Sequence, residues 1–223
     1  MIRVAVAGAS GRMGSTTCDA VAAAEDLELT GRADPATGVA LAGVLGDADV
    51  LVDFTVPDQV LANAEACLRA GVDLVIGATG FDFEALRRLC AEHPARHVFV
   101  APNFAIGAVL MMRFAAEAAR HMDGAEIVEY HHPAKLDAPS GTARRTAELM
   151  AESSGREVPI HSVRLPGLVA DQDVLLGAQA QTLTLRHVTT DRTSFMPGVL
   201  LAIRQVAGLA ESPTVGLERL LWP

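Results

Sequence analysis

Residues 1–104 alternate short apolar runs with helical patterns, and this alternation restricts the fold more than any other feature of the sequence. The apolar runs bounded by turn residues are Ile2–Ala7, Leu27–Ala33, Val50–Phe54, Leu74–Ile76 and Val98–Ala101. The helical patterns between them are Met13–Ala24, Gln59–Arg69 and Phe81–Cys90. Short strands that alternate with helices are typical of crossover units, so we expect a mostly parallel sheet with helices on both faces.

A glycine-rich turn joins the first expected strand to the first expected helix. Gly8-Ala9-Ser10-Gly11-Arg12-Met13-Gly14 has the spacing G-x-x-G-x-x-G rather than the more common G-x-G-x-x-G. Glycines let the backbone approach a pyrophosphate, and the helix that follows offers N–H donors and positive potential. The turn predicts a dinucleotide site; a glycine-rich turn without a ligand is the alternative. The expected contacts are Gly8, Ala9, Ser10, Gly11, Arg12 and Met13.

Three further segments should lie at the carboxyl edge of the same sheet, where ligands bind in folds of this kind. Asp34 ends the second strand about twenty positions after the glycines, where an acidic residue meets the ribose hydroxyls of a dinucleotide. The turns after two other strands are candidates for the nicotinamide end. Their expected contact residues are Gly77, Ala78, Thr79, Ala101, Pro102, Asn103 and Phe104.

The pattern changes after Asn103. Helices are expected at Ile106–Arg120 and Thr142–Ser153, with a strand at Glu126–Tyr130 between them. Strand-like stretches without intervening helices then favour an antiparallel or mixed sheet, at Ile160–Arg164, Asp173–Leu176 and Thr182–Val188. Gly198–Val206 is expected to return as a helix onto the first part of the chain.

These patterns predict an α/β fold with two domains. Residues 1–104 and 197–223 would form a Rossmann-type dinucleotide-binding domain with a mostly parallel sheet. Residues 105–196 would form an α+β substrate-binding and oligomerisation domain. Its small sheet is rich in Val and Leu, and one helix layer would leave an apolar face exposed in a monomer. Pairing of such faces predicts a closed oligomer.

The densest polar cluster reads EYHHPAKLDAPSGTA and runs from Glu129 to Ala143. A histidine acts as a general acid near neutral pH, and Lys135 offers a point charge for a carboxylate. Gly141 and Thr142, at an expected helix start, offer N–H donors to a second carboxylate. The cluster predicts a site for an anion that becomes protonated, with structural histidines as the alternative. No metal is expected, because no Cys or further His lies at ligand spacing.

Composition excludes several classes of function. The net charge of −9 disfavours a nucleic-acid partner, and no apolar run approaches the roughly 20 residues that span a bilayer. The N-terminus shows no signal-peptide pattern, so a cytoplasmic protein is expected. Cys18, Cys67 and Cys90 fall in expected helices and are interpreted as buried free thiols.

The sequence resembles the 4-hydroxy-tetrahydrodipicolinate reductase family, also called dihydrodipicolinate reductase, of bacterial lysine (diaminopimelate) biosynthesis. The similarity covers essentially the whole chain and is most specific in the cluster that begins at Glu129. The other matching segments are GASGRMG, VDFT at Val52–Thr55, GATG, APNFAIG at Ala101–Gly107 and RTSFMPG at Arg192–Gly198.

The resemblance implies NADH or NADPH as hydride donor, a homotetramer and a small cyclic imine with two carboxylates as substrate. His131 matches the catalytic acid, and Lys135 matches the residue that binds the substrate or helps to protonate it. Hydride would reach C4 of the ring, and C3 of the enamine so formed would be protonated. The substrate contacts expected from the family are His132, Lys135, Ser140, Gly141 and Thr142.

Two other functions remain open on this scaffold: an amino-acid dehydrogenase and a dinucleotide sensor without turnover. Neither needs the combination of His131, Lys135 and a Ser-Gly-Thr helix start. For cofactor choice, a carboxylate at Asp34 repels a 2′-phosphate, and the next residue, Pro35, has neither charge nor donor. We therefore expect NADH to be used at least as well as NADPH.

Overall fold

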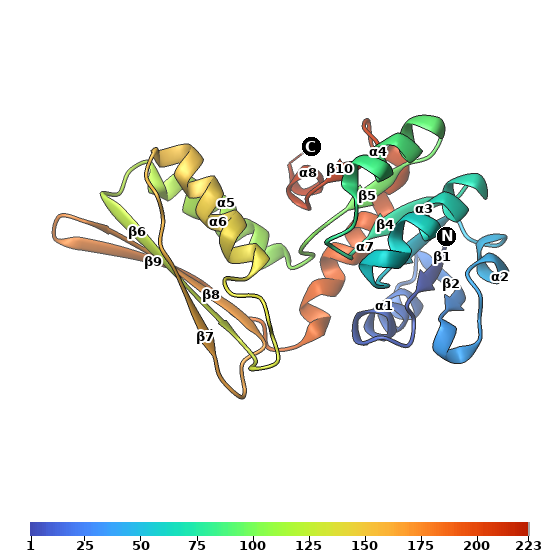
Figure 1. Ribbon diagram of the computed structural model, residues 1–223, viewed down its shortest axis with the longest axis horizontal. Helices are drawn as coiled ribbons and strands as arrows, with labels where there is room; N and C mark the ends of the chain where they lie inside the picture. Colours follow the sequence, from blue (N-terminus) through green and yellow to red (C-terminus); the bar gives the residue numbers. More distant parts are fainter. Residues whose placement is uncertain (223) are drawn as a thin grey trace. The chain divides into compact units, whose positions relative to one another are not determined.

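The computed structural model describes residues 1–222, and the chain divides into two units. Unit 1 contains Met1–Phe104 and the residues from Phe195 onward, and unit 2 contains Ala105–Ser194. Each unit is built around its own sheet, and the two are described separately (Figure 1).

Unit 1 contains a parallel sheet of six strands in the order β10-β5-β4-β3-β1-β2. The strands are β1 (Ile2–Ala7), β2 (Leu27–Ala33), β3 (Val50–Asp53), β4 (Asp73–Ile76), β5 (Val98–Val100) and β10 (Thr214–Val215). Strands β3, β4 and β5 are buried at every position, because helices cover both faces of the sheet. The helices are α1 (Arg12–Ala23), α2 (Ala42–Leu45), α3 (Pro57–Arg69), α4 (Phe83–Glu92), α7 (Met196–Gln205) and α8 (Glu218–Leu221).

The strand order of unit 1 reverses next to β1. Strand β2 pairs with one edge of β1, and β3 pairs with the other edge. The sheet therefore grows from β1 first toward β2 and then, with β3, β4 and β5, in the opposite direction. Such a switch point opens a crevice at the carboxyl ends of the two strands. The glycine-rich turn begins at this point, directly after Ala7.

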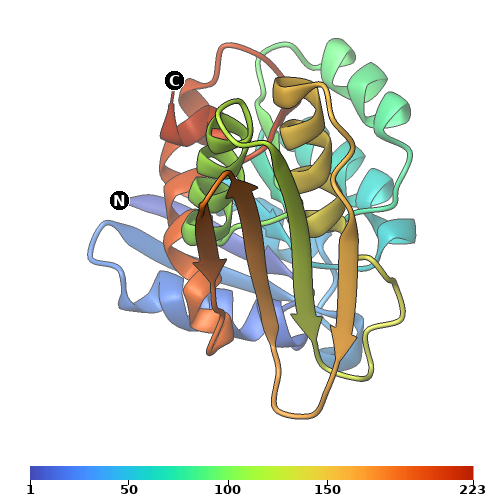
Figure 2. The same ribbon diagram turned by 90° about the vertical axis from the view of Figure 1, so that its left-hand side faces the viewer.

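Unit 2 contains a mixed sheet in the order β7-β6-β8-β9. Its elements are α5 (Ile106–Ala119), β6 (Gly124–His131), α6 (Gly141–Ser154), β7 (Ile160–Arg164), β8 (Ala170–Ala178) and β9 (Gln181–His187). Strands β6 and β7 are parallel and joined through α6, whereas β8 runs antiparallel to both β6 and β9. Helices α5 and α6 lie on one face of the sheet, and Figure 2 shows no described helix of this unit on the other face.

The core of unit 2 follows from strand alternation. Ile127 on β6 and Val174 and Leu176 on β8 are buried beneath the helices, together with Met150 of α6. On the opposite face, Leu175 remains 41% exposed.

The fold class predicted from the sequence is confirmed, and most predicted elements lie within three residues of their expected ends. Strand β8 is longer than expected, since it begins at Ala170 rather than Asp173. The short elements α2, β10 and α8 were not predicted. Cys18, Cys67 and Cys90 lie in α1, α3 and α4 and are buried free thiols, as predicted.

Candidate functional site

The glycine-rich turn of unit 1 is shaped by the absence of side chains. Gly8 has φ +73°, and a Cβ placed on it would lie 2.8 Å from the carbonyl oxygen of Phe54, just after β3. A Cβ on Gly14 would overlap the backbone of Gly8 itself. Both positions therefore require glycine, so that the backbone of the turn is exposed where β1 and β3 diverge.

The start of α1 is suited to an anion. Its N-cap is Gly11, and within residues 1–222 no side chain caps the helix and no acidic residue occupies its first turn. The N-terminal N–H groups and the helix dipole are therefore not neutralised by a side chain at this end. Together with the bare glycine backbone, this arrangement fits the pyrophosphate of a dinucleotide.

Asp34 is brought to the same turn from the end of β2. Its carboxylate accepts hydrogen bonds from the backbone N–H of Ser10 at 2.8 Å and of Ala36 at 2.9 Å. The bonds from Ala36 and Ser10 hold the pKa of Asp34 below its usual value. Asp34 is therefore anionic at neutral pH and fixed beside the glycine turn.

The other two predicted turns also follow parallel strands at the carboxyl edge. Gly77, Ala78 and Thr79 come after β4, and Ala101 to Phe104 come after β5. Phe104 is 3% exposed and packs edge-on against Phe54, with ring centroids 5.9 Å apart. The side chain of Phe104 therefore belongs to the core, and only its backbone is available to a ligand.

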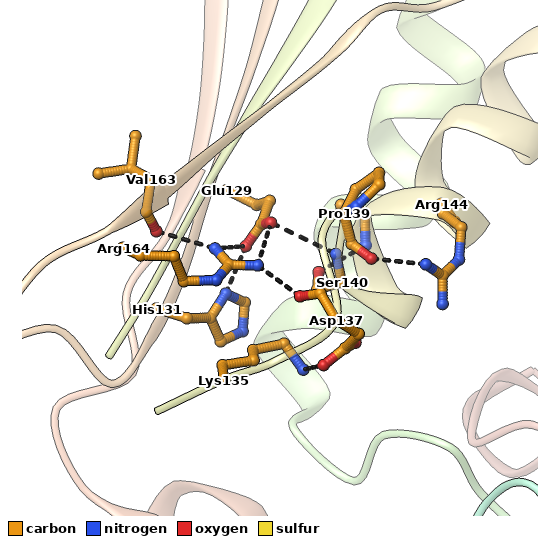
Figure 3. Close-up of polar contacts among 10 residues, drawn as sticks. Glu129, His131, Lys135, Asp137, Pro139, Ser140, Arg144, Val163 and Arg164 are labelled. Atoms are coloured by element: carbon orange, nitrogen blue, oxygen red, sulfur yellow. Dashed lines mark hydrogen bonds and ion pairs between the residues drawn. The ribbon is translucent and has the colours of Figure 1, made fainter. Parts of the chain in front are cut away.

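The polar cluster of unit 2 surrounds the end of β6, the loop after it and the start of α6 (Figure 3). His131 is the last residue of β6, and its side chain is 14% exposed. In the following loop the ammonium of Lys135 lies 2.8 Å from a carboxylate oxygen of Asp137. The predicted proton donor and the predicted cation thus come from one continuous segment.

Glu129 forms the buried centre of this cluster. Its carboxylate is fully buried and contacts Nδ1 of His131. The guanidinium of Arg164 donates to both carboxylate oxygens, at 2.8 and 3.0 Å, and the backbone N–H of Ser140 donates at 3.3 Å. Burial would raise the pKa of Glu129, but hydrogen bonds from Arg164, Ser162 and His131 outweigh it and the pKa lies below its usual value.

His131 responds to opposing effects. Burial lowers its pKa, the hydrogen bond and charge of Glu129 act in the opposite direction, and the cations Lys135 and Arg164 add to the lowering. The net pKa lies below the ordinary value of His, so the ring is mostly neutral at pH 7. With Glu129 as acceptor for a hydrogen on Nδ1, Nε2 is the nitrogen left to exchange a proton.

The start of α6 is capped by Ser140. The hydroxyl of Ser140 accepts a hydrogen bond from the N–H of Ala143 at 3.2 Å, and the residue is 3% exposed. Its hydroxyl oxygen therefore caps the helix. Gly141 and Thr142 follow as the first residues of α6, and Arg144 donates to the carbonyl oxygen of Pro139 at 2.6 Å. Backbone N–H groups at a helix start favour an anion here.

The structure adds residues that the sequence reasoning did not single out as site residues. Glu129 was noted only as the first residue of the cluster, and Arg164 only as the end of a strand. The register of β6 and β7, which pairs His131 with Arg164 and Glu129 with Ser162, brings them together across 35 positions of sequence. The available signal was strand alternation, which places the charged residue Arg164 on the side of β7 that faces the helices.

Among residues 1–222, no group of three or more His, Cys, Asp or Glu side chains is arranged to hold a metal ion. No helix in this part of the chain is long and apolar enough to cross a membrane.

Comparison with known families identifies both units. Residues 2–104 match the family model described as "Dihydrodipicolinate reductase, N-terminus", and residues 107–221 match "Dihydrodipicolinate reductase, C-terminus". The chain belongs to the dihydrodipicolinate reductase family. The predicted family and the predicted class of NAD(P)H-dependent oxidoreductase are thereby confirmed, and the N-terminal domain of this family implies a nicotinamide cofactor.

Individual relatives agree over the whole chain. Proteins named "4-hydroxy-tetrahydrodipicolinate reductase" from Mycolicibacterium smegmatis and Cutibacterium acnes are 46% and 49% identical, and the matches cover 99% of both chains in each case. A dipicolinate-bound dihydrodipicolinate reductase from Paenisporosarcina sp. TG-14 is 39% identical with a TM-score of 0.85, covering 98% of this chain and 99% of that one. A probable dehydrogenase from Thermotoga maritima, at 13% identity and a TM-score of 0.65, shares the fold alone.

Proposed function

We propose that this chain catalyses the reaction for which its relatives are named, the NADH- or NADPH-dependent reduction of 4-hydroxy-tetrahydrodipicolinate to tetrahydrodipicolinate. The observation that carries the proposal is the grouping of His131, Lys135 and the start of α6 around one loop of unit 2. A histidine that can take up and deliver a proton, an ammonium and helix N–H groups are what a dicarboxylate that must gain a proton requires.

In this proposal unit 1 is the dinucleotide-binding domain. The backbone from Gly8 to Met13 and the start of α1 would hold the pyrophosphate, and Asp34 would accept hydrogen bonds from the adenosine ribose. The turns Gly77–Thr79 and Ala101–Phe104 would flank the nicotinamide ring through their backbone. The 4-hydroxyl and a hydrogen from C3 would first leave the substrate as water, and the cofactor bound there would supply a hydride to C4 of the conjugated imine that remains.

Unit 2 is proposed as the substrate-binding domain. One carboxylate of the substrate would lie at the N–H groups of Gly141 and Thr142, and His132 and Lys135 would contact its charges. Ser140 would donate its hydroxyl hydrogen to the substrate, while its hydroxyl oxygen accepts from Ala143 and caps α6. The ammonium of Lys135 would exchange its ion pair with Asp137 for the substrate carboxylate, which keeps the charge paired throughout binding.

His131 is proposed to deliver the proton. In the free protein its pKa is lowered by burial and by two neighbouring cations. A bound dicarboxylate adds negative charge beside the ring and offsets those cations, so binding raises the pKa toward neutrality. Protonated Nε2 would then donate to C3 of the enamine formed after hydride transfer, and Glu129 would stabilise the imidazolium through Nδ1.

Three broader features complete the proposal. A homotetramer would cover the sheet face of unit 2 that no described helix covers. The protein would act in the cytoplasm. NADH would serve at least as well as NADPH. The carboxylate of Asp34 would repel a 2′-phosphate, and Pro35 has no hydrogen-bond donor for it.

A coupled assay tests the proposed activity. The cyclic imine is generated freshly from pyruvate and aspartate semialdehyde, and NADH absorbance is followed with and without it. The proposal expects NADH oxidation only when the imine is present. Oxidation of a diamino acid or aspartate with NAD⁺, and none with the imine, would favour an amino-acid dehydrogenase. NADH binding without turnover of either substrate would indicate a sensor.

A further inference from the structure

The carboxylate of Glu129 is buried in unit 2 and is contacted by several hydrogen-bonding groups. Along β6, Ile127, Glu129 and His131 point to the same side of the sheet, and Glu129 occupies a position that an apolar residue would fill in an ordinary core. Burying a charge is costly unless it is paired and hydrogen-bonded. Glu129 is fully buried and satisfied from three directions: β7, the start of α6 and its own strand.

Arg164, the last residue of β7, contacts the same elements. Its guanidinium donates to both oxygens of Glu129 and also to the carbonyl oxygen of Asp137 at 2.7 Å (Figure 3). Asp137 is the partner of the Lys135 ammonium, so Arg164 fixes the backbone from which that ion pair is built. A lysine at position 164 has no planar fork and cannot make these contacts together.

We propose that Glu129 and Arg164 are positioning residues of the reductase, an inference that rests on the proposed function. Glu129 holds the hydrogen of the His131 ring on Nδ1, which leaves Nε2 to take up and deliver the proton. Arg164 keeps Glu129 ionised and in place, and it holds the loop that carries Lys135. Neither residue touches the substrate; both act through His131 and that loop.

The charges around His131 make Glu129 the decisive partner. The charged groups that face the ring in the described chain are Glu129 on β6, Arg164 on β7 and Lys135 in the loop, with Asp137 paired to Lys135. Burial and the two cations all disfavour the protonated ring. Glu129 is the acidic group that contacts it directly. Removal of this carboxylate should therefore lower the pKa of His131 further and release the ring from a single tautomer.

The first test compares Glu129→Gln with a matched control. Glu117 on α5 also pairs with an arginine and a histidine, at 3.0 Å to Arg120 and 3.6 Å to His121, but its side chain is 61% exposed. We expect Glu129→Gln to lower kcat about 10²-fold, within the range that a general acid contributes, with a smaller change in KM. Glu117→Gln should retain kcat and KM within twofold.

Nitrogen NMR of the His131 ring gives a readout that a purely structural role would not change. The ring signals are assigned with His131→Gln and recorded without substrate at a pH where the ring is neutral. Wild-type protein and Glu117→Gln should show the hydrogen on Nδ1 only. Glu129→Gln should show a mixture of tautomers, and on titration the midpoint of His131 should move to lower pH, because a negative charge has been removed.

A double variant separates positioning from folding. Glu129→Gln alone leaves the partly buried Arg164 without its charged partner and is expected to lower Tm. Glu129→Gln combined with Arg164→Met removes both charges and should recover most of that Tm, while kcat stays low because His131 still lacks its carboxylate. Recovery of kcat together with Tm would show that the pair only stabilises the sheet, and the inference would be wrong.

Failure of this inference is distinguishable from failure of the proposed function. If the wild-type protein does not reduce the cyclic imine, the proposed function fails, and the tautomer of His131 still shows whether Glu129 orients it. If the wild type is active but Glu129→Gln retains kcat within threefold and the Nδ1 hydrogen, the positioning role is overturned.

Discussion

The two units build their candidate sites from different parts of the chain, mainly backbone in unit 1 and mainly side chains in unit 2. In unit 1 the candidate cofactor site is made of backbone, and Gly8 and Gly14 are needed because any Cβ would overlap neighbouring main chain. In unit 2 the site is made of charged side chains held by other charged side chains, from Arg164 through Glu129 to His131. An added side chain at Gly8 or Gly14 should therefore disturb the candidate site in unit 1, whereas the loss of a charged side chain should disturb the candidate site in unit 2.

This difference has a physical origin in what each site handles. A pyrophosphate keeps its charge throughout the reaction, so fixed N–H dipoles and a helix terminus are sufficient. A substrate that gains a proton needs groups whose own protonation can change. Among the 18 lysines and arginines of the chain, Lys135 is the only lysine. The only lysine of the chain therefore belongs to the proposed substrate site, where its ammonium offers a compact point charge with three N–H donors.

The largest effect is expected for His131→Gln, which removes the proton donor of the side-chain site. Turnover should fall about 10²–10⁴-fold, the usual contribution of a general acid. The Kd for NADH, measured by fluorescence titration, should remain unchanged, because the proposed cofactor site lies in unit 1. A loss of NADH affinity as large as the loss of turnover would place His131 in the cofactor site instead.

Lys135→Ala should have the next largest effect. In the proposed site the ammonium would contact a substrate carboxylate and balance charge in the transition state, so KM should rise and kcat should fall together. Loss of a charge-assisted hydrogen bond of about 1.5–3 kcal/mol corresponds to roughly 10- to 150-fold in kcat/KM. Inhibition by dipicolinate should weaken in parallel. Unchanged inhibition and unchanged turnover would show that Lys135 is a surface residue.

Gly14→Ala tests the candidate backbone site of unit 1. Its Cβ would meet the backbone of Gly8, and such overpacking costs about 1–3 kcal/mol. We expect Tm to fall and the Kd for NADH to rise about tenfold, with no change in the tautomer of His131. Gly43→Ala in α2 is the control, because a Cβ there meets nothing within 4 Å. Equal NADH affinity in both variants would argue against the backbone site.

Pro35→Arg should produce the smallest effect. Wild-type protein should favour NADH by roughly fivefold, or about 1 kcal/mol, the net contribution of a typical hydrogen bond. A guanidinium after Asp34 would offset the repulsion of a 2′-phosphate and shift the ratio of kcat/KM values toward NADPH. Its neighbour Asp34 keeps its bond to Ser10 and so remains anionic. A wild-type preference for NADPH of tenfold or more would contradict this interpretation of Asp34 and Pro35.

The sequence predicted the parts of this molecule that depend on local pattern. The strand–glycine–helix order located β1 and α1, and the Ser-Gly-Thr triplet located the start of α6. Strand β10 has two residues and exists only because it pairs with β5, so no periodicity could reveal it. The beginning of β8 resembled a loop because it is polar, yet Asp171 and Gln172 are buried with partners at Thr189 and Thr146.

The side-chain site was predicted only in its contiguous part. His131 and Lys135 lie four positions apart in one motif, whereas Arg164 reaches Glu129 through strand register. Register is set by how β6 and β7 pair around α6, which no window of sequence contains. Ser140 was predicted to contact the substrate; in the structure its hydroxyl oxygen accepts from Ala143, and the substrate contact stays a prediction.

The most direct measurement of the central claim follows the two hydrogens separately. NADH deuterated at C4 of its nicotinamide ring is used to reduce the cyclic imine in ordinary water, and the reverse labelling is carried out in heavy water with unlabelled NADH. The account predicts that the cofactor deuterium appears at C4 of the product and solvent deuterium at C3. Cofactor deuterium missing from C4, or a C3 position without solvent label, would contradict a division in which one unit supplies hydride and the other a proton.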